Sequence, residues 1–62
     1  MEPALIRVEE AAKFISLGRS KTYELIAAGE IPVVRIGRSV RVPVEGLRTW
    51  VRRQEEEANG VR

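Results

Sequence analysis

The chain has 62 residues, which allows one small domain at most. It contains no cysteine and no histidine, so disulfides, metal sites built on thiolate or imidazole, and the two side chains most used in catalysis are excluded. No apolar run is long enough for a signal peptide or a membrane span. We therefore expect a cytoplasmic protein that is not an enzyme, needs no cofactor and has no membrane partner.

The positions of the charges are more informative than the formal net charge of +2. In residues 11–43 only two carboxylates, Glu24 and Glu30, stand against a larger number of cations. After Val51 the two signs offset each other. A local basic surface of this kind suits a polyanion such as DNA. The cations of the middle stretch are Lys13, Arg19, Lys21, Arg35, Arg38 and Arg41.

Two short helices joined by a tight turn are predicted in the first half of the chain. In VEEAAKFI, residues 8–15, apolar side chains recur at helical spacing, and LGRSKTYELIAAG predicts a second helix over residues 19–28. That helix should end at Gly29, because glycine adopts the left-handed C-cap conformation most easily. Ala11 and Ala12 are small enough for the two helices to cross closely. The pattern favours a helix-turn-helix, and an ordinary helical hairpin with a polar outer face is the alternative.

The start of the second helix is the part predicted to read DNA, since this end of a recognition helix enters the major groove. Thr22 lies with Leu17 and Ile26 on the inner side of a helical wheel. Tyr23 has two interpretations: its ring packs at the edge of the core, or its hydroxyl reaches a phosphate, which makes the hydroxyl a secondary candidate. The outward-facing residues of this helix are Arg19, Ser20, Lys21 and Glu24.

A β-hairpin is predicted over residues 31–43, IPVVRIGRSVRVP, which are rich in β-branched side chains and carry a glycine in the middle. A three-residue loop of Gly37, Arg38 and Ser39 would pair Ile36 with Val40, Val34 with Val42, and Arg35 with Arg41. One face would then be apolar and the other basic. A two-residue loop at Gly37 and Arg38 would pair Arg35 with Val40 and mix the faces, so the longer loop is preferred.

The predicted basic face of this hairpin is a second candidate for DNA contact. Arg35 and Arg41 would repel each other as direct neighbours, and a bound phosphate would relieve that repulsion. Arg38 would lie near the tip. The alternative is a basic edge that is simply solvated.

A last helix should begin at Pro43 and bury a stripe of Val44, Leu47, Trp50, Val51 and Gln54. In this prediction Trp50 locks the helix across the first two, and Phe14 closes the core from the side. The helix should fray before Asn59 and Gly60, because it is polar all round beyond Val51. We thus expect a flexible lead-in over residues 1–5, one domain over residues 6–54 and a frayed polar tail over residues 55–62.

The ordered set VEEAA, LGRSKTYELIAAGEIP, VRIGRSVRVP and EGLRTWV resembles the small winged helix-turn-helix domains of the excisionase type, which are related to the DNA-binding heads of MerR-class regulators. The resemblance covers residues 5–51. It implies an α+β fold with two short helices, a β-hairpin wing and a C-terminal helix. It also implies DNA contact through the start of the second helix and through the wing. The candidate DNA-binding residues, from the sequence pattern and from the resemblance taken together, are Arg19, Ser20, Lys21, Thr22, Tyr23, Arg35, Arg38 and Arg41.

The resemblance further implies an architectural factor that binds repeats in double-stranded DNA, bends them and assists a phage or element integrase in excision. Integrase and further copies of the chain are the implied protein partners. A compact MerR-like transcriptional regulator is the first alternative, and a protein-interaction module that docks through the last helix is the second. The chain departs from the family pattern at three caps, where Arg7, Ser16 and Gly18 stand in place of the usual threonine, glycine and serine.

Overall fold

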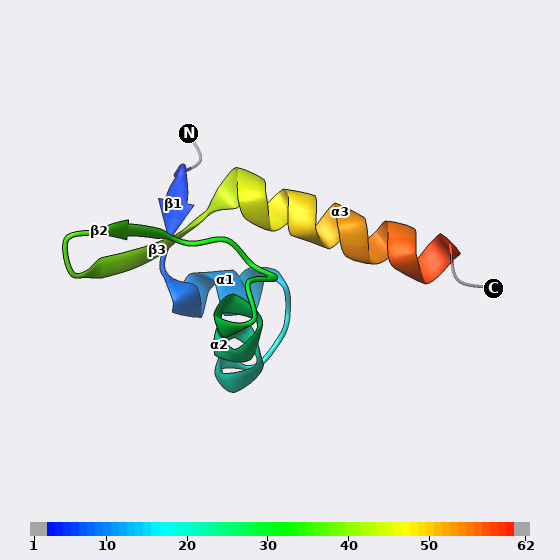
Figure 1. Ribbon diagram of the computed structural model, residues 1–62, viewed down its shortest axis with the longest axis horizontal. Helices are drawn as coiled ribbons and strands as arrows, with labels where there is room; N and C mark the ends of the chain where they lie inside the picture. The colour runs from blue at the N-terminus through cyan, green and yellow to red at the C-terminus, as the bar shows by residue number, and fades with distance from the viewer. Residues whose placement is uncertain (1–2, 61–62) are drawn as a thin grey trace.

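The computed structural model describes residues 3–60, which form three helices and three strands, so the predicted α+β winged helix-turn-helix fold is confirmed. Helices α1 and α2 pack together on one side of the sheet, the β2–β3 hairpin projects from one end of the molecule, and α3 projects from the other (Figure 1). The elements in chain order are β1 (Leu5–Ile6), α1 (Val8–Phe14), α2 (Arg19–Ala27), β2 (Val34–Ile36), β3 (Ser39–Pro43) and α3 (Val44–Gly60).

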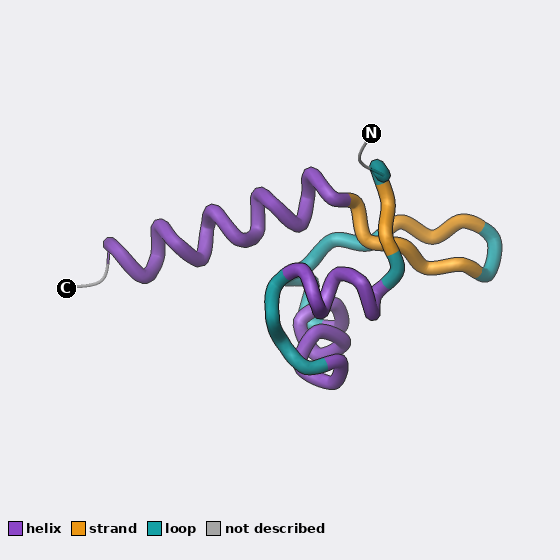
Figure 2. Tube along the Cα trace, turned by 180° about the vertical axis from the view of Figure 1, so that it is seen from behind, coloured by secondary structure: helices purple, strands orange, loops and turns teal. Residues whose placement is uncertain are grey.

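The sheet is antiparallel with strand order β1, β3, β2, so β3 is its central strand (Figure 2). In β1, Leu5 pairs with Pro43 and Ile6 pairs with Val42. The Val44 amide continues this pairing by donating a hydrogen bond of 2.9 Å to the Ala4 carbonyl. Leu5 therefore belongs to the folded domain and not to a flexible lead-in, of which residues 1–2 lie outside the described part.

The core lies where α1, α3 and β3 meet. Its central cluster consists of Val8, Ala11, Ile31, Val42 and Leu47, none of which is more than 3% exposed. Full burial of a valine, leucine or isoleucine side chain contributes about 1.5–3 kcal/mol. Ala11 is completely buried on the helix that packs against α2, in agreement with the predicted close crossing.

The end of α2 is closed by a double hydrogen-bond cap. The Gly29 amide donates to the Ile26 carbonyl at 3.0 Å, and the Glu30 amide donates to the Leu25 carbonyl at 2.9 Å. This pair of bonds is the Schellman motif, in which the residue that follows the C-cap adopts a left-handed conformation. Gly29 has a φ of 81°, so the predicted stop at this glycine is confirmed, although the helix itself ends one residue earlier than predicted, at Ala27.

The end of α1 has the same cap without a glycine. The Ser16 amide donates to the Lys13 carbonyl at 3.2 Å, and the Leu17 amide donates to the Ala12 carbonyl at 3.0 Å. Ser16 has a φ of 58° and is the one non-glycine residue of positive φ within residues 3–60. A left-handed conformation costs an L-amino acid about 1–2 kcal/mol, so the turn between the two helices keeps its geometry at an energetic cost.

The hairpin has the two-residue loop that the sequence argument rejected. Ile36 pairs with Ser39, Arg35 with Val40, and Val34 with Arg41. Among the described residues the loop has positive φ only at its first position, Gly37, at 60°. This is the φ pattern of a type II′ turn, whose twist matches that of the flanking strands. The prediction of the register was therefore wrong, because turn geometry and not a shared apolar face decides the pairing.

Helix α3 buries a narrower stripe than predicted. Val44 and Leu47 are 8% and 0% exposed and Trp50 packs against the core, but Val51 is 37% exposed. Phe14 is 50% exposed, so the prediction that it closes the core is wrong. The helix runs to Gly60, so the helical conformation includes Asn59. No helix within residues 3–60 is both long and apolar enough to cross a bilayer.

Close packing at the first turn of α3 depends on Gly46. A Cβ atom at this position would lie 2.7 Å from Cγ of Pro32 and 3.2 Å from Cγ of Pro43. Contacts this short force a neighbour to move, because protein interiors are close-packed. The glycine thus allows α3 to approach both proline rings, and it fixes the helix directly against the end of β3.

Candidate nucleic-acid interface

The first turn of α2 is open to solvent, as a recognition helix requires. Arg19, Ser20 and Lys21 are all exposed, and the N-cap residue, Gly18, has no side chain that could cover the first backbone amides. Polar side chains and backbone amides at such an end can donate hydrogen bonds to base edges or phosphates. The structure therefore brings these three candidates together at one helix end.

Thr22, in contrast, is a structural residue. Its side chain is 0% exposed, and its hydroxyl donates to the Gly18 carbonyl at 2.9 Å. The backbone amide of Thr22 donates to the same carbonyl at 3.0 Å. The inner position predicted for Thr22 from the helical wheel is correct. Its prediction as a DNA-binding residue was wrong, because a fully buried side chain cannot reach DNA.

The guanidinium group of Arg19 lies between two partners from different helices. Its Nη2 atom is 3.4 Å from Oε2 of Glu9 in α1, and its Cζ atom is 5.8 Å from the ring centroid of Tyr23 in α2. Tyr23 is 44% exposed, so its ring lies at the surface beneath the arginine. This position leaves the hydroxyl open as a secondary candidate for phosphate contact. A cation within about 6 Å of an aromatic ring is attracted by the ring electrons.

Lys21 has a partner within its own helix. Its Nζ atom is 3.6 Å from Oε1 of Glu24, three residues further along. Both side chains are more than half exposed, and exposed pairs of this kind stabilise a protein by about 0–1 kcal/mol. The lysine can therefore exchange its carboxylate for a phosphate at little cost.

The observed hairpin register places the wing arginines differently from the prediction. Arg35 pairs with Val40, which packs against the core, whereas Arg41 pairs with the exposed Val34. Because alternate residues of a strand face opposite sides, Arg35 and Arg41 lie on opposite faces and are not neighbours. Arg41 is half-buried, and its Nη1 atom donates to the Val40 carbonyl at 2.9 Å.

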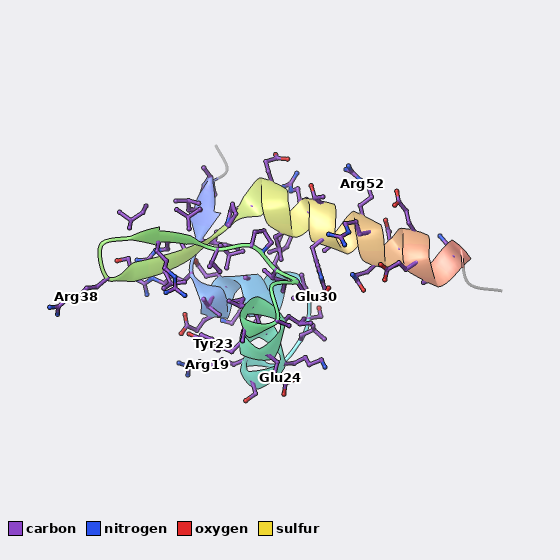
Figure 3. The ribbon with its side chains drawn as sticks, viewed as in Figure 1. Arg19, Tyr23, Glu24, Glu30, Arg38 and Arg52 are labelled. Atoms are coloured by element: carbon purple, nitrogen blue, oxygen red, sulfur yellow. The ribbon has the colours of Figure 1, made fainter. Side chains whose placement is uncertain are left out.

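Arg38 is exposed at the tip of the wing. Figure 3 shows it at the far end of the hairpin, and it shows Arg19 and Tyr23 pointing from α2 toward the same side of the molecule. Arg52 lies on α3 at the other end. The start of α2 and the wing tip thus lie on the same side of the molecule, and each can contact a duplex at a separate place.

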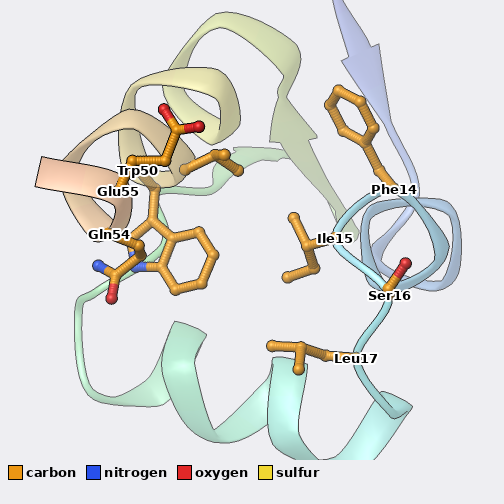
Figure 4. Close-up of a pocket in the computed structure, with 8 residues that line it drawn as sticks. Phe14, Ile15, Ser16, Leu17, Trp50, Gln54 and Glu55 are labelled. Atoms are coloured by element: carbon orange, nitrogen blue, oxygen red, sulfur yellow. The ribbon is translucent and has the colours of Figure 1, made fainter. Parts of the chain in front are cut away.

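An apolar groove of about 490 Å³ opens between the end of α1 and the middle of α3 (Figure 4). Three of its lining residues, Phe14, Leu17 and Val51, are exposed hydrophobic side chains. None of the predicted DNA-binding residues lines this groove. Phe14 and Val51 were predicted to pack in the core and Leu17 to lie on the inner side of the second helix, but all three are exposed.

One residue of the candidate interface was missed from the sequence, namely Glu9. A carboxylate in a first helical turn is common, because the helix dipole favours it there, so its position in the sequence indicates no role in DNA contact. Its approach to Arg19 depends on how α1 and α2 cross. No local pattern could have pointed to it.

Comparison with known proteins also indicates a helix-turn-helix domain similar to that of excisionases. A family model described as a helix-turn-helix domain matches residues 5–55. A protein of Saccharopolyspora erythraea named "Probable excisionase" is 64% identical over 39 residues, which cover 63% of this chain and 40% of that protein. An "Excisionase" of Streptomyces ambofaciens is 34% identical over 56 residues, which cover 90% of each chain. No solved structure gave a significant match.

Proposed function

This chain belongs to the excisionase-type family of helix-turn-helix DNA-binding proteins, and we propose that it acts as an architectural DNA-binding factor that assists an integrase in excision. The observation that carries the proposal is the shared orientation of the exposed start of α2 and the wing tip (Figure 3). In this proposal α2 enters a major groove and the wing lies on the adjacent backbone or minor groove. The protein acts by binding and not by catalysis, in the cytoplasm where the DNA is found.

The two contact regions have different tasks in this mechanism. Ser20 and Lys21 at the start of α2 read base edges, which carry the sequence information. Arg35 and Arg38 on the wing neutralise phosphates, a contribution that is independent of sequence and weakens as salt rises. Arg38 at the tip can also enter a narrow, electronegative minor groove and stabilise bent DNA.

A protein partner is the second part of the proposal. Contiguous exposed apolar side chains mark a surface that is suited to protein contact, and the groove of Figure 4 has this character. We place the contact with integrase there, because this groove leaves the side that carries α2 and the wing free for DNA. Val51→Ser should then keep DNA affinity and thermal stability while it weakens recruitment of integrase to the same duplex.

The central experiment is footprinting on the DNA that flanks the native gene, combined with an excision assay that contains integrase. We expect protection of a defined site in tandem copies and an increase in excised product that depends on this protein. A single palindromic site at a promoter, with no effect on excision, would favour the alternative of a MerR-like transcriptional regulator.

The groove also favours one alternative from a different class, a module that binds only protein. A mobility-shift assay with random duplex at low salt separates the two, since a cationic DNA-binding domain shifts such a duplex even without its specific site. Absence of any shift would overturn the proposed function.

A further inference from the structure

We propose that Glu9 and Tyr23 hold Arg19 as a reader of one guanine, an inference that rests on the proposed DNA-binding function. The arginine is the first residue of α2, and its guanidinium group lies 3.4 Å from the Glu9 carboxylate and 5.8 Å from the centre of the Tyr23 ring. Glu9 is thus a positioning residue, and Arg19 is the residue that would touch the base.

A free arginine side chain is a poor reader, because many rotamers must be given up when it binds. The planar guanidinium group has five N–H donors and recognises guanine through two parallel bonds to O6 and N7. In this protein one nitrogen, Nη2, faces Glu9, and the group lies over the ring of Tyr23. The remaining donors are free to meet a base edge in a defined orientation.

The two partners of Arg19 come from different helices, and this determines how its position is held. Glu9 belongs to α1 and Tyr23 belongs to α2, so the Arg19 position is fixed by the packing of one helix against the other. The Lys21 ammonium, in contrast, is paired only with Glu24 on the same helix turn, and an ammonium has no planar fork to orient. The structure thus prepares the arginine, and not the lysine, for a bidentate contact.

The charge of Glu9 also argues against a phosphate as the target of Arg19. This pair is as exposed as that of Lys21 and Glu24, with side chains 68% and 51% exposed, but its carboxylate comes from another helix, lies 3.4 Å from the guanidinium and would repel a phosphate placed beside it. A guanine edge presents neutral acceptors, and these can be approached without separating the pair. Arg19 should therefore contribute to sequence discrimination and little to the salt dependence of binding.

The experiment measures binding of the full chain to the footprinted site and to duplexes in which each base pair is changed in turn. Arg19→Lys should lower discrimination at one G·C pair by about 5- to 100-fold, with an unchanged salt slope. Glu9→Gln should lower discrimination at the same pair by about two- to fivefold. The double variant should be no worse than Arg19→Lys alone, because the two residues act through one contact.

Glu56→Gln is the matched control, since it removes the same charge from the exposed far part of α3. It should leave discrimination unchanged at every position, and thermal melts should show all variants folded. If Glu9→Gln strengthens binding to the site and to random duplex alike, Glu9 is only a competitor and the inference is overturned. Unchanged binding of Glu9→Gln at all positions overturns it too. A parent protein that does not distinguish the site from random duplex would instead refute the proposed function, and the inference with it.

Discussion

At the start of α2 the cationic side chains have carboxylate partners, whereas the exposed wing arginines, Arg35 and Arg38, have none among residues 3–60. The helix end is also anchored by the buried Thr22 side chain. All residues of β2, in contrast, are exposed, and the strand pairs with β3. The comparison shows how one small domain can divide recognition: oriented, partly neutralised groups suit sequence reading, and free charges suit phosphate binding.

The largest effect is expected at the helix end. Lys21→Ala or Ser20→Ala should reduce discrimination between the specific site and random duplex by about 1–3 kcal/mol if a base contact is lost. Competition binding at one fixed salt concentration measures this difference directly. Equal weakening toward both duplexes would show that the helix end, like the wing, only binds phosphate.

The anchoring of the wing can be tested at Gly46. Gly46→Ala should lower the free energy of unfolding by about 0–2 kcal/mol, since overpacking costs about 1–3 kcal/mol and the gain in helix propensity is about 1 kcal/mol. The new methyl group would press on Pro43 at the end of β3 and on Pro32. Gly60→Ala is the control, because nothing lies within 4 Å of its Cβ position. A higher melting temperature for Gly46→Ala would mean that the proline rings move aside easily.

The wing itself should act through charge. Arg38→Ala and Arg35→Ala should each weaken binding to specific and random duplexes together and flatten the slope of log affinity against log salt by about one unit. The stability of Arg38→Ala should stay within about 0.5 kcal/mol of the parent, because the side chain is exposed at a loop. Circular-permutation assays should show less DNA bending for this variant. Unchanged affinity and bending would leave the wing without a role in DNA contact.

The smallest effect concerns the turn that leads into α2. Ser16→Gly should raise the free energy of unfolding by about 0.5–1 kcal/mol, since relief of a left-handed serine exceeds the added entropy of the unfolded chain. Gly29→Ser makes the reverse change at the equivalent cap and should lower stability through backbone strain alone, because no other residue lies within 4 Å of its Cβ position. Denaturant titrations measure both. DNA affinity should not change, so a change in affinity for Ser16→Gly would indicate that strain in the turn helps to position the helix.

The amino-acid sequence by itself determined the helix-turn-helix, because its signals are local. The apolar spacing of α1, the small Ala11 at the crossing and the stop at Gly29 each act within a few residues, and the structure agrees with all three. The existence of a hairpin followed equally from β-branched residues on both sides of Gly37. These features depend on backbone preference and capping, which a sequence displays directly.

The tertiary structure alone decided the hairpin register and the setting of Arg19. Apolar alternation specifies a register only where one face of a strand is buried, and Ile36 of β2 is 57% exposed, so the tight turn at Gly37 decided the pairing in its place. Arg19 meets Glu9 across two helices, a contact between residues ten positions apart that depends on the packing of α1 against α2. Packing between elements, which no local pattern records, therefore determines how the candidate reading residue is held.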